Sequence, residues 1–262
     1  MKFIRYSHQS ETRHGLLEGE LVSELQGNIF GDWQRSGKTL PLTELKLLAP
    51  VMPTTIFCIG KNYRAHAAEF GTAAPAQPIV FLKAPNSLNH PYAPIVLPKP
   101  EQSMQIDYEA ELAIVIGKGG KNIPETEALK HVFGYTCAND VTARDWQKQD
   151  GQWARAKSLD GFCPLGPYIE TELDTADLKI EGRLNGVRVQ SARTSELLFN
   201  VPFLVHYVSQ AITLSPGSII LSGTPAGCGM ARKPPLWLQP GDSFEVDIEG
   251  IGILVNPVQA AE

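Results

Sequence analysis

The spacing of apolar and polar positions along the chain predicts many short β-strands and few helices. Apolar runs of strand length end at turn residues, most clearly at Glu18-Gly19-Glu20, Pro216-Gly217 and Pro240-Gly241. The expected strands cover residues 2–6, 16–25 on both sides of the first turn, 55–60, 106–117, 134–140, 218–221 and 243–248.

Helical spacing is confined to a few segments. The clearest helix covers about 201–214, where Asn200 is a suitable N-cap and Leu204, Val208 and Ala211 fall on one face. The other expected helices are 62–71, capped by Asn62 and ended by Gly71; 124–133, ended by Gly134; and 40–48, which stops before Pro50.

Composition supports a β-rich fold. The 262 residues include 23 glycines and 20 prolines, and short strands with few helices favour a β-rich α+β protein over a doubly wound α/β one. The proline-bounded stretch near 50–54 is the expected boundary. It separates a small N-terminal β-rich module (1–50) from a larger domain (51–262).

Charge and hydropathy exclude some partners. The formal net charge is −5 and no Lys/Arg run exceeds two residues, which argues against nucleic acid. No apolar run approaches the ~18 residues of a transmembrane helix, and the first residues do not resemble a signal peptide. Four scattered cysteines predict buried free thiols in a reducing compartment, so we expect a cytoplasmic protein without membrane contact.

The first candidate for chemistry is the acidic run within 106–117. Asp107, Glu109 and Glu111 alternate, so in one strand they share a face with about 7 Å between neighbours. Like charges beside a core require compensation, and a hard divalent cation such as Mg²⁺ or Ca²⁺ supplies it. The alternative is an edge strand with a solvated acidic face. Asp140, at the end of the strand 134–140, could complete a three-carboxylate site or cap a turn.

Three further features could serve catalysis. His66 and Glu69 lie three residues apart on the expected helix, where the carboxylate would orient the imidazole as a general base. An ordinary surface pair is the alternative. Lys157 could be a buried cation for an anionic substrate or a solvated lysine. The loop 223–227 could offer backbone N–H groups to a carboxylate, although glycine-rich loops are common.

Together these segments resemble the fumarylacetoacetate hydrolase family, over about residues 55–258. The likeness is to its acylpyruvate hydrolase and 2-hydroxyhepta-2,4-diene-1,7-dioate isomerase-like branch. The matching motifs are Gly-Lys-Asn-Tyr-Arg-Ala-His-Ala-Ala-Glu (60–69), Asp-Tyr-Glu-Ala-Glu-Leu-Ala (107–113), Gly-Tyr-Thr-Cys-Ala-Asn-Asp-Val-Thr-Ala-Arg-Asp-Trp-Gln (134–147), Ala-Lys-Ser (156–158), Gly-Thr-Pro-Ala-Gly (223–227) and Gly-Ile-Gly (250–252).

The resemblance implies a mixed β-sandwich roll, a homodimer and a Mg²⁺ or Mn²⁺ ion, with Ca²⁺ as a substitute in crystals. Asp107 matches an acid that does not usually bind the metal. Ser-Leu-Asp-Gly after Lys157 departs from the aromatic residue and threonine that relatives often carry there. The implied site residues are the metal ligands Glu109, Glu111 and Asp140; the lid dyad His66 and Glu69; Lys157 beside the substrate oxygens; and the pocket residues Arg144, Gln147 and Thr224.

The implied activity is hydrolysis of a C–C bond in a β-diketo acid of acylpyruvate or fumarylpyruvate type, through a metal-stabilised pyruvate enolate. In that mechanism His66 and Glu69 activate the attacking water, and Lys157 stabilises the oxyanion. The same enolate chemistry also supports oxaloacetate decarboxylation and keto–enol tautomerisation or isomerisation. A different class of alternative is an inactive, metal-binding structural protein.

Overall fold

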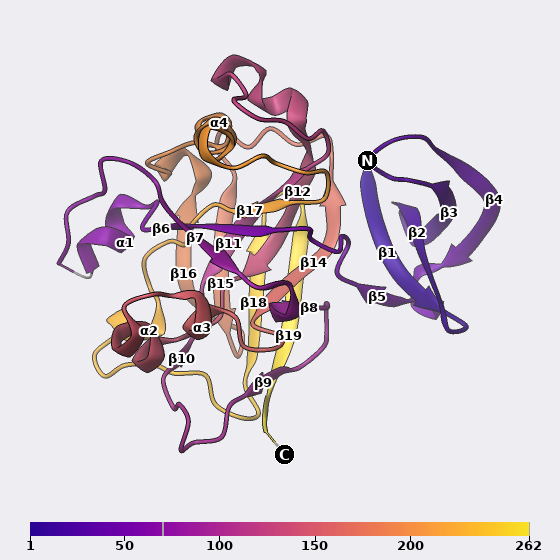
Figure 1. Ribbon diagram of the computed structural model, residues 1–262. Helices are drawn as coiled ribbons and strands as arrows, with labels where there is room; N and C mark the ends of the chain where they lie inside the picture. The colour runs from indigo at the N-terminus through magenta and orange to yellow at the C-terminus, as the bar shows by residue number, and fades with distance from the viewer. Residues whose placement is uncertain (70, 262) are drawn as a thin grey trace.

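The computed structural model describes residues 1–69 and 71–261 and is built mainly from two β-sheets (Figure 1). The main strands of the larger sheet are, in spatial order, β4 (Trp33–Pro41), β3 (Leu21–Gly27), β2 (Glu11–Glu18), β1 (Lys2–His8), β14 (Cys163–Glu170), β12 (Val132–Asn139), β11 (Ala110–Ile116), β17 (Ile219–Leu221), β6 (Ile56–Gly60) and β7 (Ile79–Lys83). Two short strands complete this sheet: β5 (Lys46–Leu48) pairs with β1, and β8 (Leu88–Asn89) pairs with β14.

The second sheet packs against the β11, β12 and β14 part of the first. Its strands are β16 (Val187–Arg193), β15 (Lys179–Leu184), β18 (Ser243–Ile248), β19 (Gly252–Ala260) and β9 (Ile95–Leu97). Leu112 and Ile114 of β11 share one core cluster with Ile180 and Val246 of the second sheet, and all four are buried. Burial of such side chains contributes about 1.5–3 kcal/mol each. The β-rich fold predicted from the sequence is confirmed.

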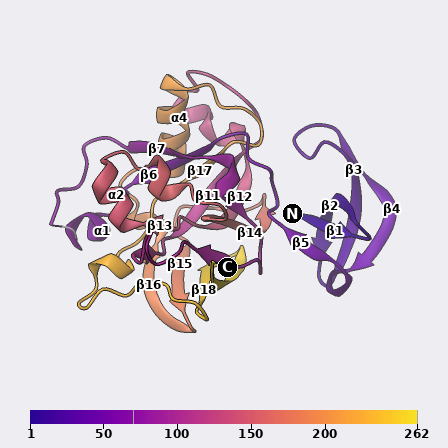
Figure 2. The same cartoon turned by 60° about the horizontal axis from the view of Figure 1, so that its bottom comes forward.

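The N-terminal strands β1–β5 stand apart from this sandwich as a small β-module, the indigo and violet strands of Figures 1 and 2. Antiparallel pairing of β1 with β14 joins the module to the main sheet, with Lys2 opposite Glu170. Phe3 packs at this junction, where the centroid of its ring lies 4.9 Å from that of Phe133. Both views place the module on the opposite side of the main body from α1 and α2.

Helices are short and lie at the edges of the sheets. Asn200 accepts a hydrogen bond from the Phe203 N–H, as predicted for the N-cap of α4. Among the described residues, no helix is both long and apolar enough to cross a membrane. The α-helices are α1 (Arg64–Glu69), α2 (Arg144–Asp150), α3 (Ala154–Lys157) and α4 (Val201–Ala211), and the 3₁₀ turns are η1 (Leu42–Glu44), η2 (Pro85–Ser87), η3 (Glu125–His131), η4 (Thr194–Glu196) and η5 (Gly229–Ala231).

Four local predictions were wrong. The expected helix 124–133 is the 3₁₀ turn η3, which stops at His131, and Gly134 lies within β12. Residues 40–48 form the end of β4, a 3₁₀ turn and β5, because pairing with β1 outweighs the helical spacing. Asn62 does not cap α1; its side-chain amide instead donates to the carbonyls of Phe199 and Ser222, holding two distant loops together. The run 106–117 is broken into β10 (Ile106–Asp107) and β11, since β10 pairs with β13 (Thr142–Ala143) in a separate ladder.

Candidate active site

Antiparallel pairing of β11 with β12 brings three carboxylates together at one end of the main sheet. Ala110 lies opposite Asn139, so Glu109 and Glu111 flank the start of one strand while Asp140 follows the end of the other. Their exposed fractions are 5%, 2% and 0%, respectively. One oxygen of each lies within 4.8 Å of the other two. The three predicted metal ligands therefore form a compact, buried group.

Asp107 has a different place from the one that strand periodicity predicted. The break after β10 turns its carboxylate toward the backbone N–H groups of Gly229 and Met230, at 2.7 and 3.1 Å. A Cβ at Gly229 would collide with the Leu236 carbonyl oxygen and lie 2.8 Å from that carboxylate, which explains why glycine is required. Asp107 also accepts a 2.8 Å hydrogen bond from Arg144 Nε. It therefore holds the 229–230 turn and an arginine in place.

Buried cations surround the carboxylates. Lys157 Nζ lies 2.7 Å from both Glu109 Oε2 and Asp140 Oδ2. Arg144 Nη2 donates to Glu109 Oε1 at 2.6 Å. Burial alone would raise the pKa of Glu109, but Lys157 and Arg144 outweigh it and lower that pKa well below its ordinary value. The pKa of Lys157 is raised because Asp140 and Glu109 outweigh its burial. Lys157 therefore stays protonated.

Glu111 provides the strongest indication that the site can hold a further cation. Its Oε2 accepts the Gly223 N–H at 2.7 Å, but within the described part of the chain no Lys, Arg or His lies within salt-bridge distance. Burial and the charges of Asp140 and Glu109 raise the pKa of Glu111 well above its ordinary value. A divalent cation among the three carboxylates would reverse this destabilisation. The donor set fits a hard metal, whose identity the geometry does not fix.

Lys83 is a part of the site that sequence reasoning missed. It ends β7, is 2% exposed, and its Nζ lies 2.7 Å from Asp140 Oδ1. The signal was available: a five-residue strand of otherwise apolar residues ends in a lysine. With Lys83, Arg144 and Lys157 facing Asp107, Glu109, Glu111 and Asp140, three positive charges meet four negative ones. One negative charge is left uncompensated.

Replacing Lys83 with methionine is expected to lower the free energy of unfolding by about 3–5 kcal/mol, because Asp140 keeps its buried charge and loses a partner. Lys130→Met is the matched control. It removes an exposed ion pair with Glu127 and should cost about 0–1 kcal/mol. Urea unfolding in EDTA measures both. Equal effects would show that the buried pair adds nothing.

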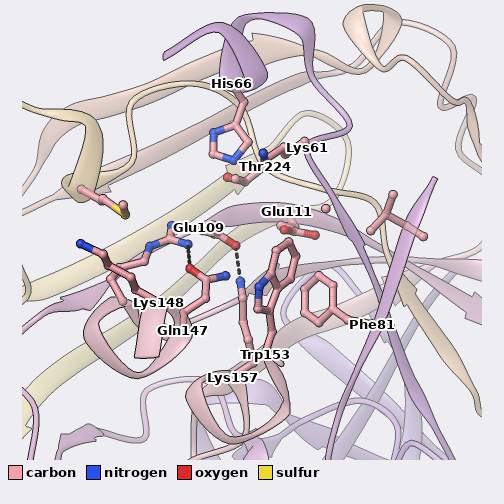
Figure 3. A pocket seen from close by; sticks show the side chains of 14 residues that line it. Lys61, His66, Phe81, Glu109, Glu111, Gln147, Lys148, Trp153, Lys157 and Thr224 are labelled. Atoms are coloured by element: carbon pink, nitrogen blue, oxygen red, sulfur yellow. Dashed lines mark hydrogen bonds and ion pairs between the residues drawn. The ribbon is translucent and has the colours of Figure 1, made fainter. Parts of the chain in front are cut away.

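The predicted dyad is present on α1. His66 Nδ1 lies 2.7 Å from Glu69 Oε1, and Glu69 Oε2 accepts the Gly227 N–H at 2.9 Å. Gly227 has φ +108°, and a Cβ there would meet the Val189 carbonyl, so only glycine allows this approach. The His66 side chain is 6% exposed and points from α1 toward Glu109, opposite Lys157 (Figure 3).

A cavity of about 280 Å³ lies between His66 and the buried cation Lys157 (Figure 3). Trp153 and Phe81 form one wall, with their rings 5.0 Å apart and nearly perpendicular. The predicted pocket residues Arg144, Gln147 and Thr224 all line the cavity. Gln147 accepts a 3.0 Å hydrogen bond from Arg144 Nη1, and the Thr224 hydroxyl donates to the Ala110 carbonyl.

Two lysines at the rim were not predicted. Lys61 and Lys148 line the same cavity, and neither lies within salt-bridge distance of an acid in the ranges 1–69 and 71–261. Lys61 has φ +56°, a left-handed conformation that residues other than glycine seldom adopt. Its Nζ donates to the Thr72 hydroxyl at 3.2 Å. Positive charge without a local acid suits an anionic substrate group.

Comparison with known proteins fits this geometry. Residues 55–259 match the family described as fumarylacetoacetate (FAA) hydrolase, C-terminal, and residues 1–50 match the Rv2993c-like N-terminal family. This chain belongs to the fumarylacetoacetate hydrolase family. Protein Rv2993c of Mycobacterium tuberculosis is 43% identical to it, with 98% of both chains covered. The human mitochondrial oxaloacetate tautomerase FAHD2A is 46% identical, with 84% of this chain and 71% of the relative covered.

A solved relative has the same fold throughout. The 5-carboxymethyl-2-hydroxymuconate delta-isomerase of Mycobacterium smegmatis superposes with a TM-score of 0.91 at 39% identity, with both chains fully covered. The family resemblance predicted from the motifs is confirmed. These tautomerase and isomerase relatives favour keto–enol tautomerisation or isomerisation over hydrolysis of a C–C bond. The homodimer and the cytoplasmic location stay predictions.

Proposed function

We propose that this protein is a keto–enol tautomerase of a short 2-oxo dicarboxylic acid of the oxaloacetate class. The observation that carries the proposal is a single oriented imidazole facing buried, permanently charged groups across a small cavity. The cavity of about 280 Å³ is smaller than the ~300–1,000 Å³ of sites for drug-sized ligands. This space suits a short substrate such as a four-carbon acid.

The pocket residues divide the chemistry between charge and proton transfer. We assign binding of the 2-oxo-carboxylate end to Arg144, Gln147 and Lys157, because all three line the cavity. Because Lys157 and Arg144 both have raised pKa values, their contribution is to stabilise negative charge on the enolate oxygen. A divalent metal held by Glu109, Glu111 and Asp140 would supply Lewis acidity toward the same enolate.

His66 is the proton carrier in this mechanism. Glu69 orients the ring through Nδ1, and we assign proton exchange with the substrate to Nε2. The keto form gives its C3 proton to Nε2, and the resulting imidazolium returns a proton to the enolate oxygen. The step conserves atoms and charge and requires no water. Hydrolysis, by contrast, needs a water held at the distal carbonyl.

The rim lysines predict a preference for dicarboxylates. We expect the double variant Lys61→Met/Lys148→Met to raise KM for oxaloacetate by about tenfold, equivalent to about 1.4 kcal/mol, and to leave kcat largely unchanged. The reason is that the distal carboxylate loses both cations. Steady-state kinetics measure the effect, with Lys99→Met/Lys130→Met as the charge-matched control. An unchanged KM would refute the assignment.

An ultraviolet assay tests the proposed function. Purified protein with Mg²⁺ is mixed with the enol form of oxaloacetate, and the loss of enol absorbance is followed together with pyruvate release. The proposal expects rapid loss of the enol with no pyruvate above the spontaneous rate. Acetylpyruvate is the parallel substrate. Its cleavage at a higher kcat/KM than oxaloacetate tautomerisation would restore the hydrolase interpretation.

A further inference from the structure

A thiol that the proposed mechanism does not use lies beside the dyad. Cys228 Sγ is 3.9 Å from His66 Nδ1, which is itself 2.7 Å from Glu69 Oε1. The three donor atoms lie within 4.8 Å of one another. Cys228 is fully buried, and it follows the 223–227 loop, whereas the other two residues belong to α1. Two separate segments thus converge with a sulfur, a nitrogen and an oxygen donor.

We propose that His66, Glu69 and Cys228 form a second metal site, selective for Zn²⁺, whose occupation inhibits the enzyme. Thiolate and imidazole donors favour zinc, whereas Mg²⁺ prefers the oxygen donors of the carboxylate group. The two sites therefore differ in chemistry as well as position. Zinc would enter as a regulator or an inhibitor, separate from the metal of the enolate site.

The distances suit zinc after a small adjustment. Bonds of about 2.3 Å to sulfur and about 2.0 Å to nitrogen place the two atoms about 3.5 Å apart around a tetrahedral ion, against the 3.9 Å observed. Nitrogen and oxygen ligands of a tetrahedral zinc lie about 3.3 Å apart, so Glu69 must retreat from its 2.7 Å hydrogen bond. Its side chain is 17% exposed and ends a short helix, which leaves room to move.

The surroundings favour a cation at this point. Burial, Asp107 and Glu109 raise the pKa of the Cys228 thiol well above its ordinary value, and Arg144 opposes them in part. The same negative charges that disfavour a bare thiolate attract a metal ion. Thiolate and carboxylate together neutralise Zn²⁺, so the occupied site carries no net charge.

Occupation would switch off the proton carrier, a consequence that rests on the proposed function. Zinc takes the Nδ1 lone pair, so the neutral ring must carry its proton on Nε2. The Cys228 thiol gives its proton to solvent, and this is the one proton released. Nε2–H cannot accept the C3 proton of the substrate. The metal would also tie α1 to the loop that Gly227 already contacts.

Cobalt(II) tests the site without relying on activity. With Mg²⁺ in excess to fill the carboxylate site, Co²⁺ is expected to produce a thiolate-to-cobalt charge-transfer band in the wild type and in Cys137→Ala. Cys137 is the matched control because it is equally buried and lies in β12. The band should be absent in Cys228→Ala and in Cys228→Ser, which keeps the side-chain shape. No band in the wild type, or an undiminished band in the folded Cys228 variants, would overturn the site.

Zinc titration of activity tests the regulation. Under the same excess of Mg²⁺, Zn²⁺ should inhibit the wild type at a concentration at least tenfold lower than it inhibits Cys228→Ala. Equal inhibition of both would place zinc at the carboxylates and refute the inhibitory role. If the wild type lacks tautomerase activity altogether, the proposed function fails, and the cobalt band still decides whether the metal site exists.

Discussion

Replacing His66 with alanine is expected to slow tautomerisation by about 10²–10⁴-fold, the usual contribution of a positioned acid–base group. The reason is geometric: His66 lines the pocket, and Glu69 fixes the ring through a 2.7 Å hydrogen bond. Lys157 and Arg144 cannot replace it, because their raised pKa values keep both protonated. The loss should appear in kcat, since binding of the acid depends on other residues.

Two controls accompany that experiment. His8→Ala removes a histidine from β1 of the N-terminal module and should leave kcat within about twofold, since surface substitutions seldom disturb a remote site. The Mg²⁺ affinity of His66→Ala should match that of the wild type, because the carboxylate ligands Glu109, Glu111 and Asp140 remain. Turnover of His66→Ala at the wild-type rate would eliminate the histidine from the mechanism.

Replacing Glu111 with glutamine is expected to abolish Mn²⁺ binding at the carboxylate group and, in EDTA, to stabilise the protein by about 1 kcal/mol or more. Its pKa is raised in the fold, so the folded state binds its proton more tightly than the unfolded chain. Such a group destabilises the fold at every pH above its unfolded pKa, and glutamine removes that penalty. Titration calorimetry with Mn²⁺ and urea unfolding measure the two effects.

Glu181→Gln is the matched control for stability. Glu181 is also 2% exposed, but it contacts Lys179, Arg183 and Arg188. Its pKa is lowered, chiefly by the hydrogen bond from Lys179. Neutralising it should therefore destabilise the protein at neutral pH. The account of Glu111 fails if both variants change stability in the same direction.

Much of the site could be predicted because short motifs carry it. The carboxylates flank strand ends that the apolar pattern defines, and the His66–Glu69 spacing needs only one helical turn. The turn at Pro240-Gly241 and the cap at Asn200 were equally local signals. Such features depend on near neighbours in the sequence, which is why pattern reasoning finds them.

The predictions that were wrong or missed share one physical cause, which is pairing between segments far apart in the sequence. Asp107 leaves the acidic face because β10 pairs with β13, more than thirty residues away in the sequence. Asn62 bridges Phe199 and Ser222 instead of capping its own helix. The roles of Lys83 and Cys228 likewise depend on partners brought close by sheet pairing. Long-range contacts override local propensity, and a single sequence does not reveal them.

Proton exchange at C3 of oxaloacetate tests the central claim most directly. Oxaloacetate in D₂O is followed by NMR with Mg²⁺, with the wild-type protein and with His66→Ala. The account predicts that the wild type accelerates deuterium incorporation at C3 while pyruvate forms only at the spontaneous rate, and that His66→Ala loses this acceleration. Pyruvate appearing as fast as deuterium enters, or equal exchange by both proteins, would contradict it.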